Sequence, residues 1–240
     1  MGLLALAIAP GLAIAIYIYF KDKFNKEPLW LLVFSFILGI VSIVPAIIAE
    51  SSSKISLNNM ANEPTLNIAF FAYIVVGGSE EISKFLMVRI FLFKRSAFDD
   101  PFDGIVYCVM VSMGFATIEN IAYVVNGGLT TAILRMFLSV PAHATFGILM
   151  GYFVGLAKFQ PNKGFQHMVV GVLLAIFFHG TFDFFIFISK DWLQVIGAII
   201  SFFVAIYLSK KAIKRHQAYS AQVIQSRMKS NDEEPVSSNH

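Results

Sequence analysis

The residues in this chain that could do chemistry are carboxylates and histidines that interrupt long apolar stretches. Ionisable side chains are costly inside a bilayer, so each one is a candidate functional residue. They fall in four consecutive stretches, which predicts one shared interior site. The candidates are Glu80, Glu81 and Lys84 in one stretch, Glu119 and Asn120 in the next, His143 in the third, and His179 and Asp183 in the fourth.

Two groups of these residues have the spacing of neighbours on one helix face. Glu80 and Glu81 precede Lys84 by four and three residues, so either carboxylate can neutralise the lysine. Asp183 follows His179 by four residues and can orient its ring. Each feature alone has a structural alternative, such as an internal ion pair, a packed histidine or a polar helix cap. All of these residues lie at a similar depth in their apolar stretches, and this coincidence favours a functional site over separate structural roles.

Carboxylates and histidines in a pocket that water can reach suit hydrolysis. A glutamate can take a proton from water as the water attacks a carbonyl group. Histidines can hold a divalent metal such as zinc, which needs about three protein ligands, or they can donate hydrogen bonds to the oxyanion without a metal. The chain has no H-E-x-x-H and no G-x-S-x-G, which excludes a thermolysin-like site and a serine nucleophile elbow. Asp183 is the only aspartate well inside an apolar stretch, which excludes a two-aspartate protease.

The composition indicates what must position these residues. Of the 240 residues, 57% are hydrophobic and 14% are charged, and the mean hydropathy is +0.72, whereas soluble domains have about 25% charged residues. This balance excludes a water-soluble domain and a disordered chain, and the single Cys108 excludes an internal disulfide. The basic residues behind the net charge of +3 lie between apolar runs. We therefore expect the lipid bilayer as a partner and no nucleic acid.

Seven apolar stretches are long enough to cross a bilayer, and they predict an all-α polytopic membrane helix bundle. They cover about residues 3–20, 29–49, 66–93, 102–125, 131–157, 164–188 and 191–209. No basic residue precedes Lys21, so the first stretch is expected to be a span and not a cleaved signal peptide. We expect residues 1–209 to form the membrane domain, with core helices at about 66–188. Residues 210–240 are expected to form a flexible cytoplasmic tail, basic at first and then acidic and rich in serine.

The connecting segments differ in charge. Alternate segments carry thirteen Lys and Arg residues, whereas the opposite segments carry three. By the positive-inside rule, this predicts an N-terminus outside and a C-terminus in the cytoplasm. The candidate residues would then lie about 8–20 Å below the outer surface, at 1.5 Å per helical residue. The sequence therefore predicts a polar pocket that opens toward the outside.

The candidate residues also carry a family resemblance. Glu80-Glu81-x-x-Lys84 resembles the E-E-x-x-K motif of the PrsW family of intramembrane proteases. Three further segments resemble the remaining motifs of the family and follow in the same order. They are Phe115-x-x-x-Glu119-Asn120, His143 with the following Phe146, and His179-x-x-x-Asp183. PrsW proteins are similar to the type II CAAX prenyl proteases and the bacterial CPBP/Abi membrane proteins, whose motifs are E-E-x-x-x-R, F-x-x-x-H and H-x-x-x-N. Glu119, Asp183 and the shorter spacing to Lys84 favour PrsW over prenyl processing.

The resemblance implies an endopeptidase that cuts membrane-tethered proteins in the bacterial cytoplasmic membrane. Members of the family are similar to site-one proteases that trim the extracytoplasmic part of single-span anti-sigma factors in stress signalling. A single-span protein of that type would therefore be the partner of this chain. The outward-opening pocket agrees with cleavage near the outer face.

The residue roles follow as hypotheses. Glu80 or Glu81 is the general base, with Glu80 favoured and Glu81 paired with Lys84. The rest of the site would consist of Glu119, His143 and His179, with Asp183 orienting His179 and Asn120 in support. The first three are either ligands of one divalent metal, such as zinc, or transition-state stabilisers in a metal-free glutamic mechanism.

Two other functions stay open. One is a non-catalytic membrane scaffold or chaperone, because the four-helix core also resembles the scaffold subunit of γ-secretase; the retained Glu80–Glu81 pair argues against it. The other is a proton- or metal-coupled transporter, because intramembrane Glu and His residues also relay protons. A transporter predicts polar residues that continue to the inner face, where three of these stretches are nearly free of charge.

Overall fold

The computed structural model describes residues 2–53, 63–188 and 192–233, and these residues form helices without any strand. This confirms the all-α membrane helix bundle. The α-helices are α1 (Gly2–Lys21), α2 (Leu29–Val41), α3 (Ile43–Ser52), α4 (Thr65–Phe70), α5 (Gly77–Met87), α6 (Asp103–Phe137), α7 (Ser139–Phe159), α8 (Gly164–Phe187) and α9 (Trp192–Glu233). Two π-helical segments, η2 (Phe71–Val76) and η3 (Val88–Leu92), flank α5, and a short 3₁₀ helix, η4 (Pro161–Lys163), precedes α8.

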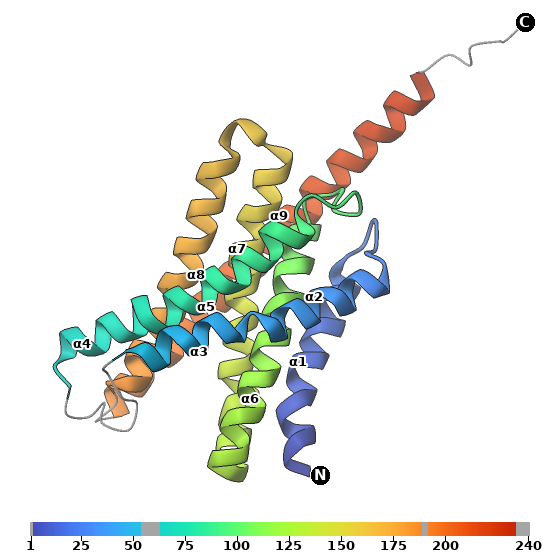
Figure 1. Cartoon of the computed structure of the whole chain (residues 1–240). Helices are drawn as coiled ribbons and strands as arrows, with labels where there is room; N and C mark the ends of the chain where they lie inside the picture. Colours follow the sequence, from blue (N-terminus) through green and yellow to red (C-terminus); the bar gives the residue numbers. More distant parts are fainter. Residues whose placement is uncertain (1, 54–62, 189–191, 234–240) are drawn as a thin grey trace, which may run out of the picture.

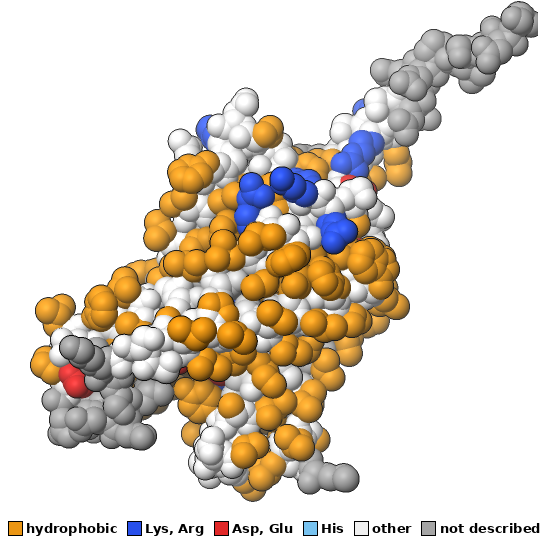
Figure 2. All heavy atoms as spheres, in the orientation of Figure 1, with side chains coloured by type: hydrophobic (Ala, Val, Ile, Leu, Met, Phe, Trp, Pro, Cys, Tyr) orange, Lys and Arg blue, Asp and Glu red, His pale blue; other side chains and the backbone are white. Residues whose placement is uncertain are grey.

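Within the described ranges, five helical stretches are long and apolar enough to cross a membrane. They are Gly2–Lys21, Leu29–Ser52, Asp103–Phe159, Pro161–Phe187 and Val195–Ser230. The third stretch contains two of the expected spans. The expected span 66–93 is not among the five: it carries four charged residues, and π-helical segments interrupt it. Hydrophobic side chains cover much of the visible surface, and Lys and Arg gather near the end from which α9 projects (Figure 2). The count of seven spans and their orientation remain predictions.

The long stretch from α6 to α7 turns back at one glycine. Gly128 has φ 71° and ψ −157°, a conformation open essentially to glycine alone. It lies between the expected spans 102–125 and 131–157, so the sequence placed the reversal correctly, although helix continues on both sides of it. The residues after Gly128 return toward the core, and this return brings Arg135 beside Glu119 and Asn120 in the first part of α6.

Helix α6 is central to the bundle, where it packs against α1, α2 and α7, and α7 packs in turn against α8. In Figure 1, α2–α3 and α4–α5 lie across the upright helices as two neighbouring rods. The α2–α6 contact is very close, because a Cβ atom on Gly39 or Gly114 would meet the carbonyl oxygen of Val111 or Phe36. Small residues permit such close backbone approach in membrane helices.

A second close approach brings α8 to the segment that precedes α5. Gly180 lies directly against the ring of Tyr73 in η2, and a Cβ atom on it would clash with that ring. The Tyr73 and Thr181 hydroxyl groups are 2.8 Å apart and share a hydrogen bond. Since Gly180 and Thr181 follow His179, these contacts hold His179 next to the start of α5.

The expected flexible tail continues as helix in its described part. Helix α9 extends from Trp192 to Glu233, and residues 234–240 lie outside the described residues. The reason lies in packing: the ring of His216 bonds through Nδ1 to the carbonyl oxygen of Pro101 at 2.7 Å, and the Ser220 hydroxyl donates to Asp100 Oδ1 at 2.7 Å. Ala212 and Ile213 are buried as well.

Candidate active site

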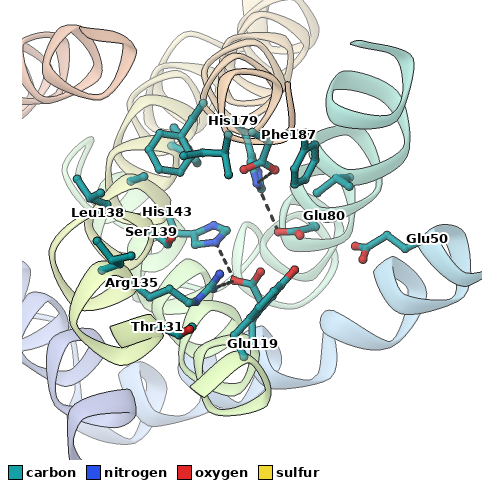
Figure 3. Close-up of a pocket in the computed structure, with 18 of the residues that line it drawn as sticks. Glu50, Glu80, Glu119, Thr131, Arg135, Leu138, Ser139, His143, His179 and Phe187 are labelled. Atoms are coloured by element: carbon teal, nitrogen blue, oxygen red, sulfur yellow. Dashed lines mark hydrogen bonds and ion pairs between the residues drawn. The ribbon is translucent and has the colours of Figure 1, made fainter. Parts of the chain in front are cut away.

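A cavity of about 410 Å³ lies among α3, α5, α6, α7 and α8. Five of the residues expected to form a site line it, namely Glu80, Glu119, His143, His179 and Asp183. Two further charged residues, Glu50 and Arg135, also line it. Figure 3 shows Glu80, Glu119, His143 and His179 converging on the cavity from separate helices, with Glu50 at its edge on α3. The predicted shared site is thus a single cavity in the structure.

The two adjacent glutamates of α5 have different surroundings. Lys84 Nζ donates to Glu81 Oε1 at 2.8 Å and to Glu80 Oε2 at 3.1 Å. Glu81 is 0% exposed and does not line the cavity, whereas Glu80 does. The lysine lies 4.0 Å from the ring centroid of Phe115, which adds a cation–π contact. Of the two glutamates, Glu80 is therefore the one whose carboxylate faces the cavity.

His179 lies among three carboxylates. Its Nδ1 atom is 2.8 Å from Glu81 Oε1, and its Nε2 atom is 3.2 Å from Asp183 Oδ2 and 3.9 Å from Glu80 Oε2. The ring of Phe146 stacks on it with centroids 4.9 Å apart. Carboxylate acceptors at both nitrogens suit a ring that donates from both. The expected pairing of His179 with Asp183 is present.

His143 is held from both sides too. Lys84 Nζ lies 3.3 Å from its Nδ1 atom, and Glu119 Oε2 lies 3.0 Å from its Nε2 atom. A lysine donor at Nδ1 leaves the proton on Nε2, which then donates to Glu119. The His143 and His179 rings are in contact, with centroids 5.0 Å apart.

Arg135 was missed by the sequence analysis. Its Nη2 atom donates to Glu119 Oε2 at 2.6 Å, and its Nε atom donates to Asn120 Oδ1 at 2.9 Å. Asn120 is fully buried and donates to the carbonyl oxygen of Ala7 at 2.8 Å, so it anchors Arg135 and α1 and does not reach the cavity. The available signal was that Arg135 is one of only three basic residues on the side with few charges. Glu50 was missed because it directly follows an expected span.

A group of four residues could hold a metal. One ligand atom from each of Glu80, Glu81, His143 and His179 lies within 4.8 Å of the others, and all four residues are buried. Among the described atoms, Glu81 Oε2 is buried without a hydrogen-bond partner. Nitrogen and carboxylate donors suit zinc, so the residues present fit such an ion.

Two neighbours bear on that fit. Lys84 Nζ already neutralises both glutamates of the group. Glu119, expected as a possible ligand, is outside the four and is engaged by Arg135. The alternative ligand set of Glu119, His143 and His179 stays a prediction.

The helix bundle and this cavity define a multi-pass membrane protein with a hydrolase-type site, in which carboxylates and imidazoles surround one space. The model of the PrsW family intramembrane metalloproteases matches residues 27–209. The chain therefore belongs to this family, and it is a membrane peptidase.

Bacterial relatives agree with the family match. The chain is similar to proteins named Protease PrsW from Geobacillus kaustophilus, Oceanobacillus iheyensis and Bacillus subtilis. The first is 33% identical over 196 residues, which cover 82% of this chain and 84% of the relative. The second is 34% identical over 216 residues, which cover 88% and 96%. The third is 31% identical over 193 residues, which cover 80% and 86%. No solved structure matches significantly.

Proposed function

We propose that this chain is an endopeptidase that cleaves a single-span membrane protein near the extracytoplasmic face of the bacterial cytoplasmic membrane, with Glu80 as the general base. The observation that carries this proposal is the contrast within the α5 pair. Glu80 lines the cavity, while Glu81 is fully buried and engaged by Lys84 and His179. Only the first carboxylate has room for a water molecule and a peptide bond beside it.

The proposed reaction is a general-base hydrolysis. Glu80 takes a proton from water while the water oxygen attacks the carbonyl carbon of the peptide bond. Asp183 orients the Nε2 side of the His179 ring before the reaction, and Glu81 holds its Nδ1 side throughout. In the reaction, the Nε2–H group turns from Asp183 and donates a hydrogen bond to the oxyanion that forms. Glu80 then returns its proton to the amide nitrogen as the C–N bond breaks. His143, fixed by Glu119 and Lys84, completes the wall of the site.

A divalent metal, for which we propose zinc, would add polarisation of the carbonyl group and activation of water. His143 and His179 would be its nitrogen ligands, and a carboxylate from the α5 pair or from Glu119 would complete three protein ligands. The metal-free glutamic mechanism is the alternative. The unpartnered Glu81 Oε2 atom supports the metal, and the Lys84 ammonium group supports the metal-free site.

The substrate proposed is a single-span protein of the anti-sigma-factor type, as the family resemblance implies. Much of the cavity wall is apolar and includes Phe146, Phe182 and Phe187, which suits apolar side chains of an unwound membrane segment. Arg135 and Glu119 place polar groups across the cavity from Phe187 (Figure 3). These groups could hold the polar backbone of an extended peptide.

Cleavage by purified protein in proteoliposomes tests the proposal. A single-span anti-sigma-type protein is supplied to the wild type, to Glu80→Gln and to His179→Ala, and the products are sized by mass spectrometry. We expect both variants to lose cleavage by about 10²–10⁴-fold, the range of a general acid or base. His167→Ala is the matched control. His167 is on the same helix as His179 but near its other end, where its ring bonds to the side chain of Gln160.

Two results would contradict the proposal. Normal cleavage by His179→Ala would remove the histidine from the mechanism. Binding of the single-span protein without cleavage by the wild type would instead favour a scaffold like the γ-secretase subunit.

A further inference from the structure

A second group of ionisable residues, four of them buried, lies around the start of α6. It consists of Asp22 and Glu27 in the α1–α2 connection, Asp99 and Asp100 before α6, and Asp103 at the first turn of α6. We call these five residues the acidic cluster. Asp103 precedes Glu119 by sixteen residues on the same helix, which is about 24 Å at 1.5 Å per residue. The acidic cluster is therefore separate from the cavity with Glu80.

The local structure orients part of the acidic cluster. Asp103 Oδ2 accepts hydrogen bonds from the backbone N–H groups of Asp99 and Asp100 at 2.8 and 2.7 Å. Asp100 Oδ1 accepts from the backbone N–H of Phe102 at 2.6 Å and from the hydroxyl of Ser220 on α9 at 2.7 Å. One oxygen of each carboxylate is thus anchored, which fixes the direction of the other.

The remaining oxygens have no partner. Among the described side chains, Asp22 Oδ2, Asp100 Oδ2 and Asp103 Oδ1 are buried atoms without a hydrogen bond. Their residues are 1%, 0% and 0% exposed. Carboxylate oxygens of Asp99, Asp100 and Asp103 lie within 4.8 Å of one another, and the charge of Asp100 acts on both Asp22 and Asp103. Asp100 and Asp103 are thus close to each other, and Asp22 is close enough to feel the charge of Asp100. Their unsatisfied oxygens would be costly without a ligand or a shared proton, such as the one between Asp103 and Glu27.

The described cations lie at the edge of the acidic cluster. Arg227 Nη1 is 3.9 Å from Asp99 Oδ2 in an exposed pair. Lys158 Nζ donates to the carbonyl oxygens of Phe93 and Arg95, and the charge of Lys26 acts on Asp22. None of them bonds to an unpartnered oxygen.

The pKa values of the acidic cluster agree with the lack of a neighbouring positive charge. Burial, together with the charge of Asp100, raises the pKa of Asp22 to about 7. Burial raises the pKa of Glu27 to about 7, although the hydroxyl of Tyr107 donates to it. The pKa of Asp100 is raised by burial as well. The carboxylates must therefore hold protons or a cation to stay buried at neutral pH.

We propose that the acidic cluster binds one hard divalent cation, Mg²⁺ or Ca²⁺, through Asp22, Asp100 and Asp103. The candidate donors are all carboxylate oxygens, the ligands that these ions prefer, whereas zinc and softer metals prefer nitrogen and sulfur. The cation joins three segments that are distant in sequence: the α1–α2 connection, the start of α6 and, through Ser220, the extension of α9. It is a structural clasp, distinct from any metal at His143 and His179.

Binding by the full-length protein in detergent tests this site. Tb³⁺ serves as the probe, because its emission is sensitised by a nearby tyrosine and Tyr107 bonds to Glu27 of the cluster. Mg²⁺ and Ca²⁺ are then used to displace it, and thermal unfolding is followed with and without each ion. We expect saturable emission, displacement by one of the two ions, and a melting temperature raised by several degrees.

Variants locate the binding. Asp22→Asn and Asp100→Asn, which preserve shape, should each weaken Tb³⁺ binding by about tenfold or more and remove the thermal shift. Glu63→Gln is the acidic control, since Glu63 bonds to Asn67 at the start of α4. His179→Ala should keep the full response, which separates this site from the cavity. Absence of emission and of thermal shift at millimolar ion would overturn the proposal, and so would an undiminished response in both Asn variants.

Discussion

The two buried groups of ionisable residues in this protein neutralise their charge in different ways. Around the cavity, Lys84 lies between Glu80 and Glu81, and two histidines accompany them. The acidic cluster contains five carboxylates, and the described cations lie only at its edge. The first group carries its own positive charge on the same helix, while the second group leaves three oxygens unpartnered.

This difference indicates what each group can do. A site with an internal cation can keep its carboxylates in place before a substrate arrives, which is what preorganised catalysis requires. A site without one depends on an ion from solution, so its stability varies with the concentration of that ion. We therefore propose the first group as the reactive centre and the second group as a structural clasp.

The largest expected effect comes from removing the internal cation. Lys84→Met should destabilise the protein by about 3–5 kcal/mol, because it leaves two buried carboxylates without compensation. Thermal and chemical unfolding in detergent measures this. Arg89→Met is the control on the next segment, where the guanidinium group stacks on Phe93 and should contribute about 0.5–1 kcal/mol. Equal effects of the two changes would refute the internal-neutralisation argument.

A chelator addresses the metal at the cavity. We expect a strong zinc chelator to lower cleavage of a single-span substrate by about 100-fold, or about 2.7 kcal/mol, and we expect added zinc to restore it. Magnesium or calcium should not substitute, because the donors include two imidazoles. Full activity in the chelator, together with metal analysis that finds no bound ion, would establish the metal-free glutamic mechanism.

Variants of Arg135 test whether residues outside the group of Glu80, Glu81, His143 and His179 help to position the side chains of the site. Arg135→Gln should reduce kcat about tenfold, because Glu119 loses its 2.6 Å ion pair and His143 loses a fixed partner. Arg135→Lys should recover part of the loss by restoring the charge. Separate measurement of kcat and KM for both variants distinguishes positioning from substrate binding, and a change in KM alone would assign Arg135 to the substrate.

The smallest expected effect is the pH dependence of the acidic cluster. The pKa values of Asp22 and Glu27 are raised to about 7 in the folded protein, so the folded state binds protons more tightly than the unfolded chain does. Stability without a divalent ion should therefore fall as the pH rises from about 4 to about 7, by a few degrees in melting temperature. Added ion at about pH 8 should restore it. The Asp22→Asn/Asp100→Asn double variant should show a flatter pH profile, and an unchanged profile would contradict the assignment.

Much of the bundle was predictable because hydropathy reports burial in lipid directly. The boundary between the expected spans 102–125 and 131–157 and the spacing of His179 and Asp183 follow from local rules, and both appear in the structure. We also predicted one shared site, because ionisable groups in a membrane protein face the interior of the helix bundle. The cavity brings together Glu80, Glu119, His143, His179 and Asp183.

The remaining features depend on contacts between distant segments. Arg135 reaches Glu119 only because the chain turns back at Gly128, so a count of loop charges could not assign its role. The acidic cluster joins residues about eighty positions apart, in segments that separately resemble polar loops. The helical extension of α9 depends on contacts of His216 and Ser220 with residues near 100. The local hydrophobic pattern of the tail does not predict these contacts.

The π-helical segments on either side of α5 have a consequence for its orientation. A π turn pairs residues five apart, so it holds one residue more than an α turn does. One residue corresponds to about 100° around an α-helix axis. Deletion of a single residue within Phe71–Val76 would therefore rotate Glu80 by about that angle relative to α4. Insertions and deletions in this apolar segment, which carries no reactive group, would change the phase of the helix and with it the face that the glutamates present.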